Sequence, residues 1–175
     1  MEWDLYDNKF QLTGKTIHEE HADEIPDGLY HLTVNVWVIN SKKQVLLLKK
    51  ALNFNFRYPG FWTSINGNVK KGKNAIDSVK DILKEKLGII IDESEIIELG
   101  KDMRDPYHYI YNTFVIYKDI NLNQITLDEN CFSKVKWADF IELENMINNG
   151  EIEMVLTQRI DIYIKNLLDT NLSNN

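Results

Sequence analysis

The segment from residue 67 to residue 88 constrains the fold of this chain most strongly. It opens with a loop that Gly67 and Gly72 punctuate, and it closes on Gly88. Between them, six apolar residues would lie on one side of a helix at 100° per residue: Ala75, Ile76, Val79, Ile82, Leu83 and Leu87. A glycine directly after such a stripe is a natural helix terminator in the left-handed conformation. The segment therefore predicts an amphipathic helix from Asn74 to Leu87 that buries one face against another layer.

Strand-like segments precede and follow this helix. Residues 29–40 are rich in β-branched and aromatic side chains, and a polar hairpin loop at 40–43 leads into a second strand at 44–50. After the helix, residues 89–101 and 107–118 and the end of 124–137 have the same character.

Further helices are predicted near the end of the sequence. Asp139 is a suitable N-cap with Glu142 as its capping-box partner, and residues 154–168 carry another helical stripe. Strands, a helix, more strands and more helices in this order predict an α+β fold or an α/β/α sandwich.

The charge of the chain is unevenly distributed. The 175 residues have a formal net charge of −7, yet residues 42–86 hold eleven basic and three acidic side chains, a local charge of +8. The remainder carries −15. A solvated basic face is one interpretation and a local anion site is the other. The acidic total argues against general binding to nucleic acid or to an anionic membrane.

The same segment resembles the Nudix box of the Nudix hydrolase superfamily. Gly67, Leu83, Glu85, Gly88 and Ile89 match the family pattern at the right spacing. The aromatic turn at 58–62 and a late tryptophan at position 137 match its usual context, and residues 3–7 and 30–32 resemble the isopentenyl-diphosphate isomerase-like branch. The resemblance covers residues 3–150.

This resemblance implies an α/β fold, a Nudix α/β/α sandwich with a mixed β-sheet. Residues 29–150 would form the Nudix domain, residues 1–28 an irregular, acidic N-terminal extension packing on it, and residues 151–175 a C-terminal helix and a frayed tail. The implied activity is hydrolysis of a nucleoside diphosphate linked to another group, with Mg²⁺ or Mn²⁺ as the cofactor.

The residues that would hold this metal are largely replaced. The family has three carboxylates at positions 82, 85 and 86, which share one face of the helix, whereas this chain has Ile82, Glu85 and Lys86. A further family glutamate falls at Cys131. Glu85 is thus the one retained box glutamate, the candidate catalytic residue and a weak metal ligand, because Lys86 repels a cation. We expect hydrolysis to be weak or lost.

Two further box positions have exchanged their charges. The family's first box glutamate is Lys73 here, and its arginine is Asp81. In the family these residues commonly form a structural ion pair, so a Lys73–Asp81 pair is expected to persist. Gly67, Asp81 and Gly88 are accordingly taken as the structural residues of the box.

The basic residues of this region are candidates for binding phosphate. Lys70, Lys71 and Lys73 lie in a glycine-flanked loop before a helix N-terminus, where backbone N–H groups favour anions, and Arg57 lies nearby in sequence. The partner would be a small phosphate compound. Three functions stay open: a Nudix hydrolase with weak or absent activity, a non-catalytic nucleotide or phosphometabolite sensor, and an interaction domain with a vestigial cleft.

Isomerase activity is not expected. In isopentenyl-diphosphate isomerases a reactive cysteine and a histidine would fall at Asn66 and Asn68, and acids near residues 110–112 are missing. His31 matches one metal ligand of that branch, but a lone histidine on a strand is more often structural.

Cysteine usage and the N-terminal residues bear on the compartment. Cys131 is the single cysteine, so an internal disulfide is excluded and a reducing compartment is favoured. The first residues lack a basic region followed by an apolar run. We therefore expect a cytoplasmic protein without membrane association. An oligomer is possible, because a second copy could supply carboxylates that the box lacks.

Overall fold

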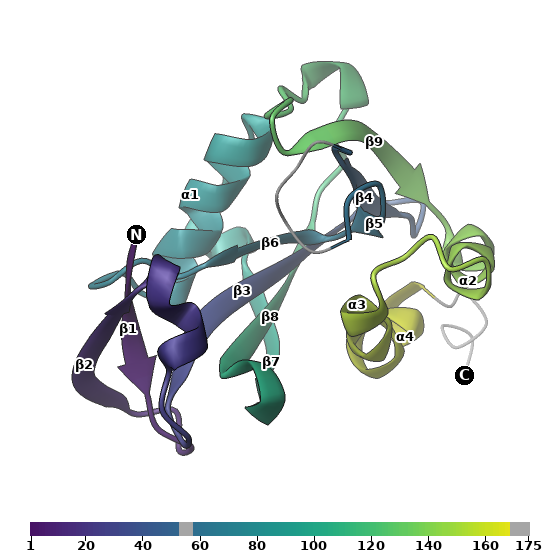
Figure 1. Ribbon diagram of the computed structural model, residues 1–175. Coiled ribbons are helices and arrows are strands. Elements are labelled where there is room, and N and C mark those ends of the chain that lie inside the picture. The colour runs from purple at the N-terminus through teal and green to yellow at the C-terminus, as the bar shows by residue number, and fades with distance from the viewer. Residues whose placement is uncertain (53–57, 169–175) are drawn as a thin grey trace.

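β3 (Tyr30–Ile39) is the strand around which the molecule is arranged (Figure 1). In the computed structural model, which describes residues 1–52 and 58–168, every residue of β3 is buried. Its β-branched and aromatic side chains suit a strand covered on both faces. β3 pairs antiparallel with the strands β1 (Glu2–Tyr6), β4 (Val45–Lys50) and β6 (Ile65–Asn68), and parallel with β8 (Tyr109–Tyr117).

The other strands extend this sheet at its edges. β2 (Leu12–His18) pairs with β1, and β7 (Ile97–Arg104) pairs with β8. β5 (Trp62–Thr63) and β9 (Phe132–Ala138) both pair with β4. Over the described residues the nine strands form one mixed sheet, in which β5 and β6 follow each other closely but pair with different neighbours, β4 and β3.

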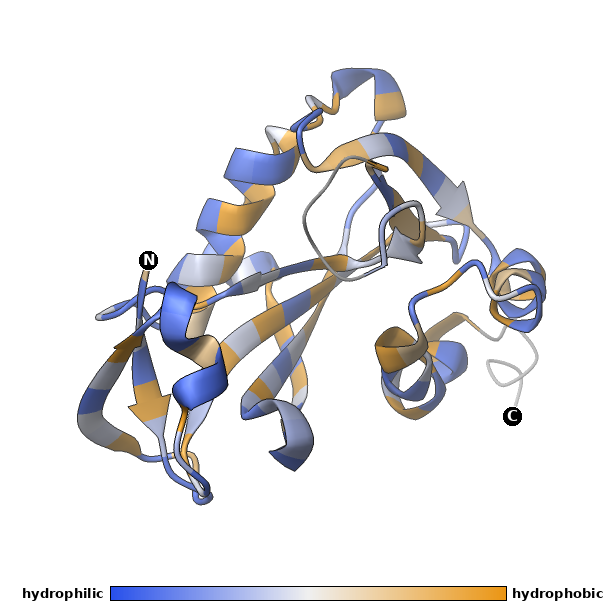
Figure 2. Cartoon of the chain, in the orientation of Figure 1, coloured by the Kyte–Doolittle hydropathy of each residue, from blue (hydrophilic) through white to orange (hydrophobic). Residues whose placement is uncertain are grey.

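α1 (Ala75–Leu87) covers one face of the sheet. Its buried residues Val79, Leu83 and Leu87 pack with alternate residues of β3, such as Val34 and Val36. Figure 2 shows the resulting division of the helix into a hydrophobic side toward the sheet and a hydrophilic side away from it.

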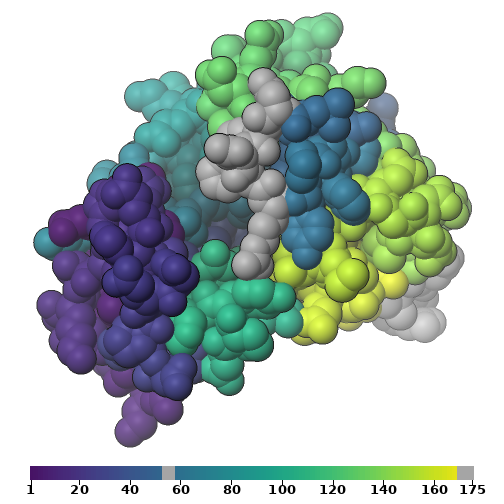
Figure 3. Space-filling view, viewed as in Figure 1, coloured from purple at the N-terminus to yellow at the C-terminus, as the bar shows by residue number. Residues whose placement is uncertain are grey.

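The other face is covered by the helices of the C-terminal part. They are α2 (Phe140–Asn148), α3 (Met154–Arg159), a π-helical turn (Ile160–Ile164) and α4 (Lys165–Leu168). Their residues Leu143, Leu156 and Ile160 pack with Trp37 and Ile39 of β3. The N-terminal strands and these helices lie at opposite ends of the face seen in Figure 3. The molecule is thus a helix–sheet–helix sandwich, as predicted.

Within the described residues, short 3₁₀ helices lie in four connections: Glu19–Glu24, Glu93–Glu95, Asp105–Tyr107 and Leu122–Gln124. The predicted N-cap Asp139 and the predicted terminator Gly88 are confirmed, whereas Asn74, predicted as the first helical residue, is the N-cap of α1. Asn74 accepts a hydrogen bond from the Asp77 amide at the start of α1, and Asp139 does the same for Glu142 at the start of α2. Gly88 ends α1 with a φ of 69°.

Residues 1–28 were predicted to be irregular, and that prediction is wrong. β1 places Trp3 and Leu5 in the core by alternation and pairs Leu5 with His31 of β3. The division of the chain at residues 28 and 150 stays a prediction, and residues 169–175 lie outside the described part. None of the helices in the described residues is long and apolar enough to span a bilayer.

Candidate functional site

Gly67 brings the end of β6 against α1. A Cβ built on Gly67 would lie 2.6 Å from Cδ1 of Ile82, a distance that real contacts do not reach. The glycine is therefore required by the close approach of strand and helix. This contact fixes the last two turns of α1 beside β6, which is where Ile82, Glu85 and Lys86 lie.

The loop between β6 and α1 carries the three lysines predicted to bind phosphate. Each forms an ion pair: Lys70 with Glu85 at 3.5 Å, Lys71 with Glu2 at 2.9 Å, and Lys73 with Asp81 at 3.0 Å. The predicted Lys73–Asp81 contact is thus present, and hydrogen bonding to Asp81 raises the pKa of Lys73. These pairs are solvent-exposed, where water and salt weaken them.

The last turn of α1 presents a different kind of lysine. The ammonium of Lys86 donates a hydrogen bond to the carbonyl oxygen of Asn66 and lies 5.6 Å from the centroid of the Phe132 ring. Burial lowers the pKa of Lys86, and the charge of nearby Lys50 adds to the effect. Ile82, in contrast, is buried in the core, and Glu85 is exposed.

Cys131 and Asp128 lie close to this ammonium. The Cys131 thiol donates a hydrogen bond to Oδ2 of Asp128 at 3.1 Å. Burial raises the pKa of Cys131 to about 11, so the thiol stays protonated at neutral pH. A protonated thiol is a poor nucleophile and a poor metal ligand.

A buried ion pair lies at the end of β4. Lys50 pairs with Glu153, the residue before α3, whose side chain is almost completely shielded from solvent. Burial raises the pKa of Glu153. On the neighbouring strand, Lys136 lies over the Trp62 ring at 4.7 Å. Sequence reasoning did not single out Lys50 or Glu153, because their pairing depends on the contact between β4 and the start of α3. Arg57 lies outside the described residues.

The side chains do not assemble a metal centre in the part of the chain that the structure describes. No group of three His, Cys, Asp or Glu residues there could hold a metal ion. At the family's box positions one carboxylate, Glu85, stands beside the ammonium of Lys86. Mg²⁺ prefers near-octahedral oxygen ligands, so these residues do not fit it.

His31 lies apart from these groups on the sheet. Its ring is fully buried, stacked on Trp3 at 4.1 Å and in edge contact with Tyr109 at 4.3 Å. Burial lowers its pKa to about 3, so the imidazole is neutral. This environment is that of a structural histidine.

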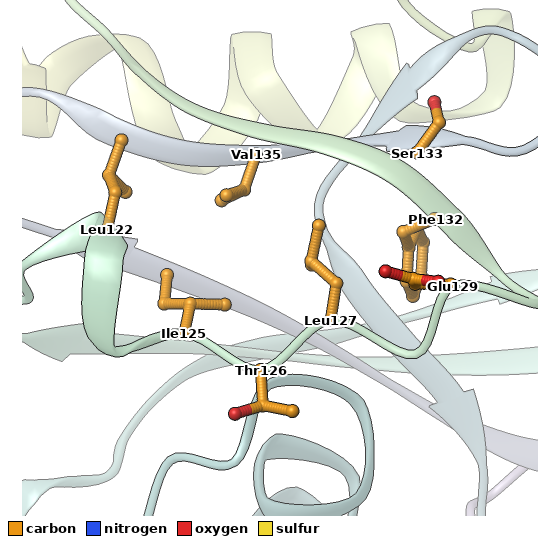
Figure 4. Close-up of a pocket in the computed structure, with 8 residues that line it drawn as sticks. All are labelled: Leu122, Ile125, Thr126, Leu127, Glu129, Phe132, Ser133 and Val135. Carbon is orange, nitrogen blue, oxygen red and sulfur yellow. The ribbon is translucent and has the colours of Figure 1, made fainter.

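The described residues also enclose an open cavity of about 580 Å³ beside β9 (Figure 4). It is lined by Leu122, Ile125, Thr126, Leu127, Glu129, Phe132, Ser133 and Val135. Figure 4 shows Leu122, Ile125, Leu127 and Val135 turned toward one another across the space. Its polar lining residues are Thr126, Ser133 and Glu129, and none of the lining residues is basic, so the cavity does not suit a polyphosphate. Phe132 lines this cavity, and the centroid of its ring lies 5.6 Å from the ammonium of Lys86.

Comparisons with known proteins agree with this arrangement. The NUDIX domain family matches residues 29–158. An uncharacterised Nudix hydrolase of Listeria monocytogenes is 29% identical over 154 residues, which cover 86% of each chain. Isopentenyl-diphosphate Delta-isomerase of Shigella flexneri is 34% identical over 129 residues, covering 71% of this chain and 70% of the isomerase.

Among solved structures, a protein from Deinococcus radiodurans superimposes with a TM-score of 0.74 at 17% identity. The match covers 92% of this chain and 98% of the other, and at this identity it concerns the fold.

Proposed function

Because this chain belongs to the NUDIX domain family, we propose that it binds a small diphosphate compound in the region around the last turn of α1, with metal-dependent hydrolysis weak or lost. Members of the family act on small phosphate-containing compounds and use divalent metal ions. The substrate class implied here is a nucleoside diphosphate linked to another group. Turnover of such a compound would be slow because the carboxylates that hold the metal are replaced.

One observation carries this proposal. The last turn of α1 offers a single carboxylate, Glu85, and that carboxylate is already paired with Lys70, while Lys86 beside it is cationic. The face of the helix that would chelate Mg²⁺ or Mn²⁺ is therefore neutral or positive. Such a face attracts the phosphate of a ligand and repels the metal.

The three loop lysines have a secondary role in the proposal. Lys70, Lys71 and Lys73 would exchange their carboxylate partners for oxygens of the ligand phosphate, as half-exposed ion pairs do at little cost. Arg57, which follows β4 in sequence, is proposed to assist them.

The experiment is a panel of nucleoside diphosphate sugars, dinucleotides and oxidised nucleotides with Mg²⁺ or Mn²⁺. Thermal shift reports binding and phosphate release reports turnover. We expect at least one compound to raise the melting temperature with little or no turnover. Turnover at about 1 s⁻¹ or faster that disappears in Glu85→Gln would overturn the loss of hydrolysis. If no compound raises the melting temperature and none is turned over, an interaction domain is favoured.

We do not extend the isomerase activity of the relatives to this chain. The positions at which that branch has a reactive cysteine and a histidine hold Asn66 and Asn68. His31 is enclosed by Trp3 and Tyr109 rather than by other potential metal ligands. Isomerisation measured with isopentenyl diphosphate and Mg²⁺ is expected to stay at background.

A further inference from the structure

Lys86 has an unusual combination of burial and partners. It lies in the last turn of α1, and within the described residues no carboxylate oxygen comes within 4.0 Å of its ammonium. Its two contacts are the carbonyl oxygen of Asn66 and the face of the Phe132 ring. Both partners are neutral, and the carboxylates of Glu85 and Asp128 act on the charge from beyond ion-pair distance.

The donors of this ammonium are not all used. A lysine ammonium carries three N–H groups, and one of them is directed at Asn66. A second cation, Lys50, lies near enough to interact electrostatically with Lys86. Lys50 is itself paired with Glu153, so the charge that would attract an anion here is chiefly that of Lys86, in a partly buried place where the local dielectric is lower than in water.

A purely structural role explains less of this arrangement. Lys86 does satisfy a backbone carbonyl of β6, but a neutral side chain or water could do that without placing a charge out of water. The exposed Lys70, Lys71 and Lys73 differ in that each has a carboxylate partner. Lys86 differs from these three loop lysines because the nearest carboxylates, those of Glu85 and Asp128, act on it only from beyond ion-pair distance.

We propose that the ammonium of Lys86 takes the place of the divalent cation and contacts a phosphate oxygen of the ligand directly, so that phosphate binding needs no metal. The inference rests on the proposed function, and it specifies how the diphosphate is held. Lys50 of β4 acts on Lys86 electrostatically but is paired with Glu153, so its role is secondary. A point charge of this kind holds a phosphate without the octahedral geometry that Mg²⁺ requires.

The test is calorimetric titration of the full chain with inorganic pyrophosphate, in EDTA and in Mg²⁺. We expect binding in EDTA to be at least as tight as in Mg²⁺, because free Mg²⁺ competes with Lys86 for pyrophosphate oxygens. Binding that appears in Mg²⁺ and is lost in EDTA would overturn the inference and leave the proposed function intact. Absence of binding in both conditions would overturn both.

Variants separate the contact from general charge. Lys86→Met is expected to raise the Kd for pyrophosphate at least tenfold, and Lys86→Arg to keep it within about threefold of wild type. Lys84→Met, on the exposed side of the same helix, removes the same formal charge and is the matched control. Its Kd is expected to change less than twofold.

Melting temperatures and circular dichroism of all three variants show whether the fold is retained. If Lys86→Met binds pyrophosphate as tightly as Lys84→Met does, the direct contact is refuted. If Lys86→Met fails to fold, the Lys86→Arg and EDTA measurements still decide, because metal-independent binding is measured on the wild-type chain.

Discussion

The two ends of α1 both carry lysines, in opposite surroundings. Before the helix, Lys71 and Lys73 stand in solvent and each is held by a carboxylate. In the last turn, Lys86 is largely shielded from solvent and has a carbonyl and a ring as its partners. With Lys70, three lysines precede the helix and each is paired with a carboxylate, whereas within the described residues neither Lys84 nor Lys86 of the last turn has a carboxylate oxygen within 4.0 Å.

This difference shows that a local excess of lysine does not by itself locate an anion site. An exposed lysine that already has a carboxylate contributes little net field, whereas a buried cation acts through a low dielectric. The same difference between buried and exposed groups holds for every ionisable side chain of the molecule. It can therefore be tested on stability, without a ligand.

The largest expected effect is on the free energy of unfolding and concerns two histidines, one buried and one exposed. His31 is buried with a pKa of about 3, and His21 is exposed beside Glu24, which raises its pKa. Unfolding frees His31 to take up a proton below its ordinary pKa of 6.5, so the unfolded state gains stability as the pH falls. The free energy of unfolding should fall by about 1.4 kcal/mol per pH unit below 6.5, or about 2 kcal/mol between pH 7 and pH 5.

Urea denaturation at pH 7, 6 and 5 measures this dependence. His31→Phe, which keeps a ring between Trp3 and Tyr109, should remove most of the slope. His21→Phe is the control and should not remove it, because the exposed histidine titrates with the opposite sign. Equal slopes for wild type and His31→Phe would show that burial of this ring does not govern acid stability.

The second prediction addresses the contact that keeps Lys86 beside β6. Gly67→Ala places a Cβ against Ile82 and should cost about 1–3 kcal/mol of unfolding free energy. Ile82→Val removes the Cδ1 atom that the new Cβ would meet, so Gly67→Ala should cost less in that background. Denaturant titration of the four proteins gives the coupling, and additive costs would contradict the close approach.

The third prediction concerns the other end of α1. Asn74→Ala removes the side-chain acceptor of the Asp77 amide and should cost about 1 kcal/mol. Asn74→Ser keeps an acceptor at the N-cap and should cost clearly less. Pyrophosphate affinity should change less than twofold in both variants, because Asn74 itself is not among the residues proposed to contact the ligand. A tenfold higher Kd in a folded Asn74→Ser protein would show that the N-cap of α1 takes part in binding and would contradict this prediction.

The smallest effect is expected for the exposed ion pair. Lys73 and Asp81 are both nearly half exposed, so a double-mutant cycle with Lys73→Met and Asp81→Asn should give a coupling of about 0.2–1 kcal/mol. The coupling should decline further in 1 M salt. A coupling above about 2 kcal/mol would mean that the loop is less screened than its exposure indicates.

Much of the fold could be predicted because its signals are local. Asn74 caps the start of α1 and Gly88 ends it, and both depend on residues that are close in sequence. The Lys73–Asp81 pair could be predicted for a similar reason, since the two residues are joined by one loop and two helical turns. The strand at residues 2–6 could not be predicted in this way. β1 is held by its pairing with β3, in which Leu5 lies opposite His31, a residue distant in sequence.

The candidate site could be predicted only in part. Helical spacing from Val79 and Ile82 already turns position 86 toward the buried side, so the shielding of Lys86 was accessible from the sequence. Its contacts were not, because Asn66 and Phe132 belong to strands that reach the helix only through the sheet. The phosphate-binding roles of Lys70, Lys71 and Lys73 stay predictions.

The parallel pairing of β3 with β8 affects the order in which the chain folds. Parallel neighbours need a long crossover, and here the crossover contains β4, β6 and α1. A nascent chain therefore exposes Lys86 before β8 and β9 exist to complete its surroundings. Contacts this distant in sequence slow folding, so the surroundings of Lys86 are completed near the end of the process. A ligand that binds there should accordingly slow unfolding and leave the folding rate nearly unchanged.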